Sequence, residues 1–156
     1  MNIRQAETKD INNLCLQYKK MYEILQSFGF PYTINEYIIG DILKVYVKSK
    51  LCCLVIAEQD GYICGFICAS INKLDRKLET EEQKQVGIIN DVYIDEQYRN
   101  QHIARRLLEY VEEWIYNSGV KSMRADIVTN NVPAYNFWVK QGYTPLYTSV
   151  YKKLDC

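Results

Sequence analysis

A short polar loop between a strand-like run and a helix-like run most strongly limits the folds open to this chain. Residues 93–110, YIDEQYRNQHIARRLLEY, begin with apolar, strand-forming residues, break at a polar segment and end with leucines at helical spacing. A helix entered in this way presents unpaired backbone N–H groups and the positive end of its dipole. Because these groups attract phosphate, we predict an anion-binding turn at the start of this helix.

The composition favours one globular domain and argues against a polyanionic partner. The 156 residues are 48% hydrophobic, which suits a single core, so we expect one domain over residues 1–156. Nineteen basic residues balance nineteen acidic ones, which disfavours nucleic acid and membranes as partners. The sequence contains neither a leader pattern nor an apolar run near 20 residues, and this predicts a cytoplasmic protein without a membrane span.

The cysteines do not follow the spacing of a metal site or of a secreted disulfide framework. Paired C-x-x-C motifs, which are typical of zinc sites, are missing from the sequence. We therefore expect reduced thiols and no metal cofactor. The six cysteines are Cys15, Cys52, Cys53, Cys64, Cys68 and Cys156.

Apolar periodicity and turn residues predict ten elements along the chain. Asp60-Gly61 between two apolar runs predicts a hairpin, and the charge-dense residues 74–85 predict a solvated loop. The order β-α-α-β-β-β-α-β-α-β indicates an α/β (α+β) fold with helices on a mixed sheet. Strands are expected at residues 2–6, 51–58, 62–71, 86–94, 122–128 and 143–152, and helices at residues 11–25, 34–47 and 133–141 and from the polar loop to Gly119.

Two stretches carry a resemblance to a known family. The first is the strand that leads through the loop RNQHIA, residues 99–104, into the helix, and the second is NVPAYNFWVKQGY, residues 131–143. They resemble the Q/R-x-x-G-x-G/A loop and the N-x-x-A-x-x-[LF]-Y-[EV]-K-x-G-[FY] region of the GNAT superfamily of acetyl-CoA-dependent N-acetyltransferases. The resemblance implies the GNAT fold, with a mixed, mostly antiparallel sheet, and acetyl-CoA as the co-substrate.

The resemblance also implies which residues hold the cofactor. Backbone N–H groups of residues 92–94 would polarise the thioester, and the loop would hold the pyrophosphate. His102 stands where the family usually has glycine, so either it accepts a backbone conformation that favours glycine or its imidazolium contacts phosphate. The implied cofactor-binding residues are Val92, Tyr93, Ile94, Arg99, Asn100, Gln101, His102, Ile103, Ala104, Arg105, Asn131 and Trp138.

The chemistry that the resemblance implies is direct attack of an amine on the acetyl thioester. A lysine-like amine is neutral in only about one molecule in 2,500 at pH 7, so its deprotonation needs help. Asp126 is the first candidate base and Asp91 the second, while Asn90 cannot accept a proton. Trp138 stands where many members have a tyrosine that protonates the leaving thiolate. Tyr135 is the candidate to replace that tyrosine as the acid.

The sequence does not choose the acceptor. A primary amine on a small molecule or a peptide fits the resemblance, and the fold also allows a homodimer. Tyrosines in the first two predicted helices could wall an amine site, although tyrosine on an apolar helix face is more often part of a core. The departures at His102 and Trp138 keep a second interpretation open, in which the chain is a catalytically weak CoA-binding regulatory module.

Overall fold

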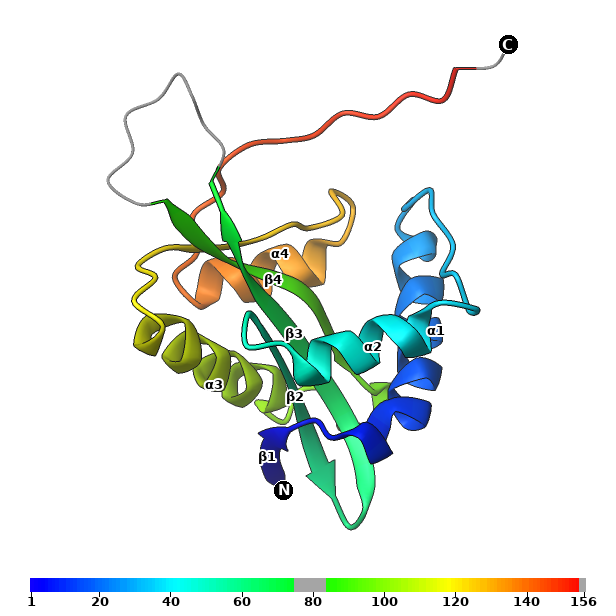
Figure 1. Ribbon diagram of the computed structural model, residues 1–156. Coiled ribbons are helices and arrows are strands. Elements are labelled where there is room, and N and C mark those ends of the chain that lie inside the picture. The colour runs from blue at the N-terminus through cyan, green and yellow to red at the C-terminus, as the bar shows by residue number, and fades with distance from the viewer. Residues whose placement is uncertain (75–83, 155–156) are drawn as a thin grey trace.

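A five-stranded sheet lies between two pairs of helices in the computed structural model (Figure 1). The structure describes residues 1–74 and 84–154. Neighbouring strands are antiparallel except for the parallel pair β4–β5, so the expected mixed, mostly antiparallel α+β fold is confirmed. The strands, in sheet order, are β1 (Asn2–Gln5), β2 (Cys52–Gln59), β3 (Tyr62–Lys73), β4 (Gln85–Ile94) and β5 (Met123–Ala125), and the helices are α1 (Ile11–Ser27), α2 (Ile39–Lys48), α3 (Ile103–Asn117) and α4 (Val132–Lys140).

Helices cover both faces of the sheet, and this explains why the central strands are apolar without alternation. In β2, Val55 and Ala57 pack into the core beneath α3 and α4, while Leu54 and Ile56 pack into the core beneath α1 and α2. A sheet with one face in water would instead place a polar residue at every second position. The sheet therefore separates two cores, and its α1–α2 face and its α3–α4 face are distinct environments.

The hairpin predicted at Asp60-Gly61 is confirmed. Asp60 has a φ of 53° and Gly61 a φ of 78°, which are the two positive values that a tight primed turn requires. This turn joins β2 to β3 and sets their antiparallel register.

One extra residue in β4, Asn90, interrupts the pairing with β3. Ile89 and Asp91 pair with consecutive residues of β3, so Asn90 has no counterpart there. Side chains normally alternate between the two faces of a strand, and Ile89 and Asp91 would otherwise share a face. Ile89 instead packs in the core beneath α3, while Asp91 is hydrogen-bonded to Tyr18 of α1. The bulge therefore turns Asp91 toward the α1–α2 face.

The strand expected at residues 143–152 is wrong for a single chain. Residues 144–154 pair with no other described strand, and they lie largely exposed (Figure 1). The Tyr143 N–H donates to the Trp138 carbonyl at 3.0 Å, which ties the chain to the end of α4, and Pro145 follows without an N–H to donate. The segment after Tyr143 therefore joins none of the described strands.

The remaining expectations concern the cysteines, the loop at residues 74–85 and a membrane span. The five described cysteines are free thiols, as expected from their spacing. Of the loop expected at residues 74–85, residues 75–83 lie outside the described residues. Over residues 1–74 and 84–154, no helix has the length and hydropathy needed to span a bilayer.

Candidate active site

The edge of β4 that faces β5 is paired at its start and open at its end. Pairing with β5 covers only Gly87 to Ile89, so the edge from Val92 to Ile94 is not paired with β5. The Ile94 carbonyl instead accepts a hydrogen bond from Arg99 Nε at 3.1 Å. A strand edge left open in this way offers backbone N–H and C=O groups to a ligand that lies alongside it.

The loop after β4 leads directly into the N-terminus of α3. Within this loop, Asn100 and His102 have positive φ values of 61° and 60°. His102 is the N-cap residue of α3, and its side chain makes no capping hydrogen bond, so the first N–H groups of the helix are left to another acceptor. The open edge of β4, the loop and the start of α3 are thus consecutive, and the cofactor residues predicted between Val92 and Arg105 lie in one continuous stretch.

His102 adopts the backbone conformation that favours glycine. Its φ of 60° and ψ of 14° fall in the left-handed region, which disfavours most L-residues by about 1–2 kcal/mol. Its side chain is exposed. Of the two explanations that the sequence left open, this geometry favours backbone strain.

Asp91 lies on the opposite side of β4, under α1. Tyr18 donates a hydrogen bond from its hydroxyl to Asp91 Oδ2 at 2.9 Å, and Tyr18 itself is buried and stacked on Phe66 with ring centroids 4.5 Å apart. Burial raises the pKa of Asp91, and the hydrogen bond from Tyr18 offsets only part of this rise. Asp91 as a whole residue keeps an intermediate exposure, although burial dominates the surroundings of its carboxylate.

A second aspartate, Asp95, lies just past the end of β4 and behaves in the opposite way. Burial alone would raise the pKa of Asp95, yet hydrogen bonds from Tyr62 at 2.7 Å and Lys20 at 3.2 Å together lower it. Asp95 is thus a stable anion that ties α1 to the end of β4. Asp91 is held by a phenol and not by a cation, and it is the carboxylate that can take up a proton near the open edge of β4.

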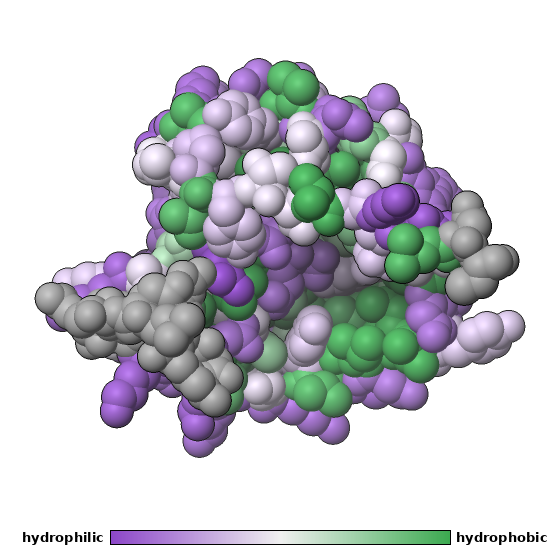
Figure 2. Space-filling view, turned by 90° about the horizontal axis from the view of Figure 1, so that it is seen from above, coloured by the Kyte–Doolittle hydropathy of each residue, from purple (hydrophilic) through white to green (hydrophobic). Residues whose placement is uncertain are grey.

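Aromatic and polar side chains surround Asp91 on the α1–α2 face. Tyr22 and Tyr46 are half-buried, and burial followed by the nearby charge of Asp91 raises the pKa of Tyr22. Ser70 Oγ accepts a hydrogen bond from Asn90 Nδ2 at 3.0 Å on the same face of the sheet. Seen from above in Figure 2, the surface is hollowed near its middle, with hydrophobic residues gathered beside the hollow.

The other predicted catalytic residues, Asp126 and Tyr135, are more exposed than Asp91. Asp126 follows β5 and its side chain is exposed, and Tyr135 on α4 is 44% exposed. Neither makes a side-chain hydrogen bond that would orient it toward Asp91 among the described contacts. Ala125 is the register partner of Ile89, so Asp126 and Asp91 both follow the last paired residues of β5 and β4, and Asp91 is the more enclosed of the two candidate bases.

The two residues predicted from the second family stretch, Asn131 and Trp138, have structural roles: one caps a helix and the other packs in the core. Asn131 Oδ1 accepts a hydrogen bond from the Ala134 N–H at 3.2 Å and caps α4. Trp138 is 7% exposed and packs edge-on against Tyr143, whose hydroxyl donates to Glu112 Oε1 at 3.1 Å. Trp138 is thus a core residue that joins α4 to α3, and this explains how the position tolerates the loss of a hydroxyl.

Sequence reasoning did not find the structural roles of three residues. Tyr18 was expected on an apolar helix face, either as part of the core or as a wall of an amine site, and its bond to Asp91 spans 73 positions of sequence. Asn90 forms the bulge. Arg124 pairs in register with Ile88, on the face opposite Ile89, and its Nε is buried with no hydrogen-bond partner among the described residues. None of these roles has a local signal, because each depends on strand register.

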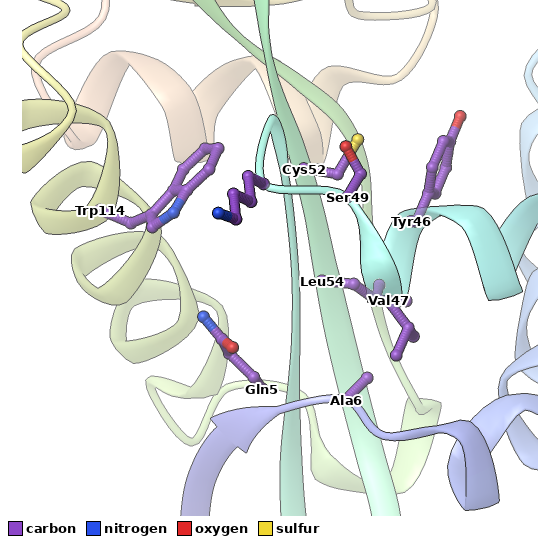
Figure 3. Close-up of a pocket in the computed structure, with 9 residues that line it drawn as sticks. Gln5, Ala6, Tyr46, Val47, Ser49, Cys52, Leu54 and Trp114 are labelled. Atoms are coloured by element: carbon purple, nitrogen blue, oxygen red, sulfur yellow. The ribbon is translucent and has the colours of Figure 1, made fainter.

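A separate cavity of about 290 Å³ lies between the end of α2, the β1–β2 edge and α3. Trp114, Gln5 and Ser49 contribute to its wall, and the Tyr46 ring stands at one side with its hydroxyl pointing away from Trp114 (Figure 3). None of the predicted catalytic or cofactor residues lines it.

Within residues 1–74 and 84–154, no group of three or more His, Cys, Asp or Glu side chains is arranged to hold a metal ion.

The sequence and the fold were compared with known proteins. The Acetyltransferase (GNAT) family matches residues 18–143. The chain belongs to the GNAT acetyltransferase family. The family resemblance and the expected enzyme class, an N-acetyltransferase, are confirmed by this match. From here on, the open edge of β4 with the α3 N-terminus is called the cofactor side, because cofactor binding is proposed for it. The surroundings of Asp91, for which acceptor binding is proposed, are called the acceptor side.

Proteins of similar length align with nearly the whole chain, one in sequence and two in fold. The uncharacterized N-acetyltransferase YhfO of Bacillus subtilis is 25% identical over 146 residues, which are 92% of this chain and 89% of that protein. The fold is similar to that of the tetramutant of the BH1408 protein from Bacillus halodurans, with a TM-score of 0.85, 18% identity, and 99% of this chain and 100% of that one covered. It is also similar to the aminoglycoside N-acetyltransferase AAC(6')-Iy in complex with CoA, with a TM-score of 0.79, 18% identity, and 99% of this chain and 95% of that one covered.

Proposed function

We propose that this GNAT protein is a single-domain enzyme that transfers the acetyl group of acetyl-CoA to a primary amine, with Asp91 as the general base. The observation that carries the assignment is a carboxylate of raised pKa on the bulge of β4, beside the point where β4 leaves β5. Acetyl-CoA supplies a thioester whose carbonyl carbon the amine attacks. The acceptor amine is left open.

The cofactor side supports binding of a polyanionic thioester. The α3 N-terminus has no side-chain cap, and its first N–H groups with the helix dipole suit a pyrophosphate. Arg99 and Arg105 are exposed cations at the two ends of the loop. The open edge of β4 at Val92 to Ile94 suits an extended ligand arm, and its N–H groups are donors for the oxyanion that acyl transfer develops.

On the acceptor side, Asp91 accepts the proton that the incoming ammonium must lose. Its raised pKa brings it closer to that of the amine than an exposed carboxylate would be, while Tyr18 holds one carboxylate oxygen in place. Asp126 is exposed and lacks this enclosure, which makes it the weaker candidate. The buried Trp138 supplies no acid, so the CoA thiolate leaves unaided; an alkyl thiol with a pKa of about 8.5 permits this.

An acceptor screen that follows release of the CoA thiol tests the proposal. Small amines, amino acids, peptides with free N-termini and aminoglycosides form the panel, because the acceptors named for structural neighbours do not carry over at this identity. We expect at least one amine to release CoA, and Asp91→Asn to abolish most of that release while Asp126→Asn retains it. If the protein binds acetyl-CoA and no amine releases CoA, the chain is instead a CoA-binding regulatory module.

A further inference from the structure

Arg124 of β5 is a cation on the same face of the sheet as Asp91. It pairs in register with Ile88 of β4, and residues that pair across neighbouring strands point to the same face. Ile88 lies on the face opposite Ile89, which packs in the core beneath α3. Arg124 therefore lies on the α1–α2 face, where Tyr18 of α1 holds Asp91.

The guanidinium of Arg124 has no bonding partner among residues 1–74 and 84–154. Its Nε is buried without a hydrogen bond, and the ion pairs of these residues are all made by other cations. Asp126, two positions further on, forms none of the described hydrogen bonds. A buried donor that carries charge is costly to leave unbonded. A ligand that brings oxygen atoms to Arg124 would explain why the cost is tolerated.

The sheet surface beside Arg124 is polar and open. Ser70 pairs with Ile88 from the β3 side, and its Oγ accepts hydrogen bonds from Asn90 Nδ2 and Asn72 Nδ2, each at 3.0 Å. Ile88 itself is half-buried and belongs to neither core. This part of the α1–α2 face therefore suits a ligand with polar groups.

Most of the cations on the helices above this face are already neutralised. Of the four lysines of α1 and α2, three lie within 3.2 Å of a carboxylate, and the fourth, Lys48, is the exposed last residue of α2. The pairs are Lys19–Glu36, Lys20–Asp95 and Lys44–Asp41. One guanidinium on the sheet matches the single charge and two oxygens of a carboxylate.

We propose that the acceptor is an amine that also carries a carboxylate, as an amino acid does, with its amine at Asp91 and its carboxylate at Arg124. The inference rests on the proposed acetyl transfer and names its acceptor class. Asp91 attracts the ammonium, while the planar guanidinium binds the carboxylate through two parallel hydrogen bonds. An acceptor with several ammonium groups brings surplus positive charge toward Arg124, so aminoglycosides should be poor acceptors.

The carboxylate takes no part in the bond changes and serves to place the amine. The ammonium gives one proton to Asp91, and its nitrogen then bonds to the acetyl carbon as the C–S bond breaks. The thiolate leaves with the electron pair of that bond. It then takes up the second proton that the nitrogen loses, which gives an amide and the CoA thiol.

Release of the CoA thiol from matched acceptors tests the acceptor class. The panel pairs each common amino acid with its carboxamide and adds aminophosphonates and an aminoglycoside. For the wild type, at least one amino acid should exceed its carboxamide about tenfold or more in kcat/KM. If carboxamides or the aminoglycoside react as well as the amino acids, the acceptor class is overturned while acetyl transfer stands. Preference for an aminophosphonate would overturn the choice of a carboxylate.

Variants of Arg124 assign the preference to this residue. Arg124→Gln should lower kcat/KM for the preferred amino acid by roughly ten- to a hundredfold and leave its carboxamide unchanged. Arg124→Lys keeps the charge but not the planar fork, so its loss should be smaller. Lys140→Gln removes the same charge at the exposed end of α4 and should keep the preference.

Thermal unfolding distinguishes this role from a structural one. Arg124→Gln should unfold at a temperature no lower than the wild type, because the described residues give Arg124 no bond to lose. A lower unfolding temperature with equal losses for amino acid and carboxamide would mean a structural role and overturn the inference.

Ligand-induced stabilisation separates this inference from acetyl transfer itself. If no amine releases CoA, acetyl transfer fails, and the unfolding temperature with the same panel decides the carboxylate site. Stabilisation by an amino acid, but not by its carboxamide, that is lost in Arg124→Gln supports the site. Equal stabilisation by both, or by neither, overturns it.

Discussion

The cofactor side and the acceptor side lie on the two sides of one strand, β4, and they are built from different parts of the chain. The cofactor side consists of backbone: the open edge from Val92 to Ile94 and the N–H groups at the start of α3. The acceptor side consists of side chains, with Asp91 held by Tyr18 and flanked by Tyr22. Backbone N–H and C=O groups are present whichever side chain a residue carries. The raised pKa of Asp91, in contrast, depends on the residues that bury it and bond to it.

This difference explains where the chain departs from the family pattern. His102 occupies a glycine position on the cofactor side, and the loop still forms with a positive φ, because the N–H groups of α3 do not depend on that side chain. Trp138 replaces a tyrosine and becomes part of the core. The acceptor side does not tolerate such replacements, because the Tyr18–Asp91 hydrogen bond needs both side chains. The two residues are 73 positions apart in the sequence.

The largest effect is expected for Asp91→Asn. An amide cannot accept a proton, so kcat should fall by about 10²- to 10⁴-fold, the contribution of a general base. The folded protein raises the pKa of Asp91, so stability from this group is present at low pH and lost as pH rises above the unfolded value. Asp91→Asn should therefore unfold at a higher temperature than the wild type at neutral pH, with the difference vanishing in acid. Steady-state kinetics and thermal unfolding measure both.

Asp126→Asn is the matched control for this prediction. Its carboxylate is exposed, so kcat and unfolding temperature should stay close to those of the wild type. The reverse outcome, an inactive Asp126→Asn and an active Asp91→Asn, would assign the base to Asp126 and reject Asp91 as the centre of the acceptor side.

A smaller effect is expected on the cofactor side for Arg105→Glu. In the proposed site Arg105 contacts a phosphate, so losing this cation and adding an anion should weaken CoA binding by roughly ten- to a hundredfold. Calorimetry with CoA and with a pantetheine analogue that lacks phosphates separates the causes, because only CoA should lose affinity. Equal losses for both ligands would contradict a phosphate site at the start of α3. Lys50→Glu controls for net charge, because it makes an equal charge change at an exposed residue that lies by Trp114, near the C-terminal end of α3 and not at its start.

Tyr18→Phe should alter the acceptor side more mildly. The stacking on Phe66 is kept, and only the hydrogen bond to Asp91 is lost. That bond lowers the pKa of Asp91, so its removal should move the acidic limb of the pH–kcat/KM profile to higher pH. At neutral pH, kcat should fall by no more than about tenfold. The same change one turn later, Tyr22→Phe, should leave the acidic limb in place; an unmoved limb in Tyr18→Phe would show that Tyr18 has only a packing role.

The smallest effect is expected for His102→Gly. Glycine relieves the left-handed strain of about 1–2 kcal/mol but loses more conformational entropy on folding, so the two terms nearly balance. CoA affinity should rise by a few-fold or stay constant. Calorimetry over a range of pH checks this, because weaker and pH-independent binding by the glycine variant would mean that the wild-type imidazolium contacts phosphate.

Local sequence patterns were sufficient for most elements and for the strand, loop and helix start that form the proposed cofactor side. Apolar periodicity predicted the helices within a few residues, and Asp60-Gly61 predicted a turn because its positive φ values are a property of those residues. The loop at residues 99–104 and the start of α3 could be predicted for the same reason. A backbone site formed by consecutive residues needs no distant partner.

The tertiary structure alone decided the acceptor side and the fate of the C-terminal segment. Which face Asp91 takes depends on the bulge at Asn90, a matter of register between β3 and β4 that no local pattern contains. Its raised pKa depends on burial beneath α1, and its orientation depends on Tyr18. Residues 144–152 have the composition of a strand, but a strand forms only where an edge is within reach. Composition determines that this segment can pair, and the path fixed at Tyr143 leaves it without a partner in its own chain.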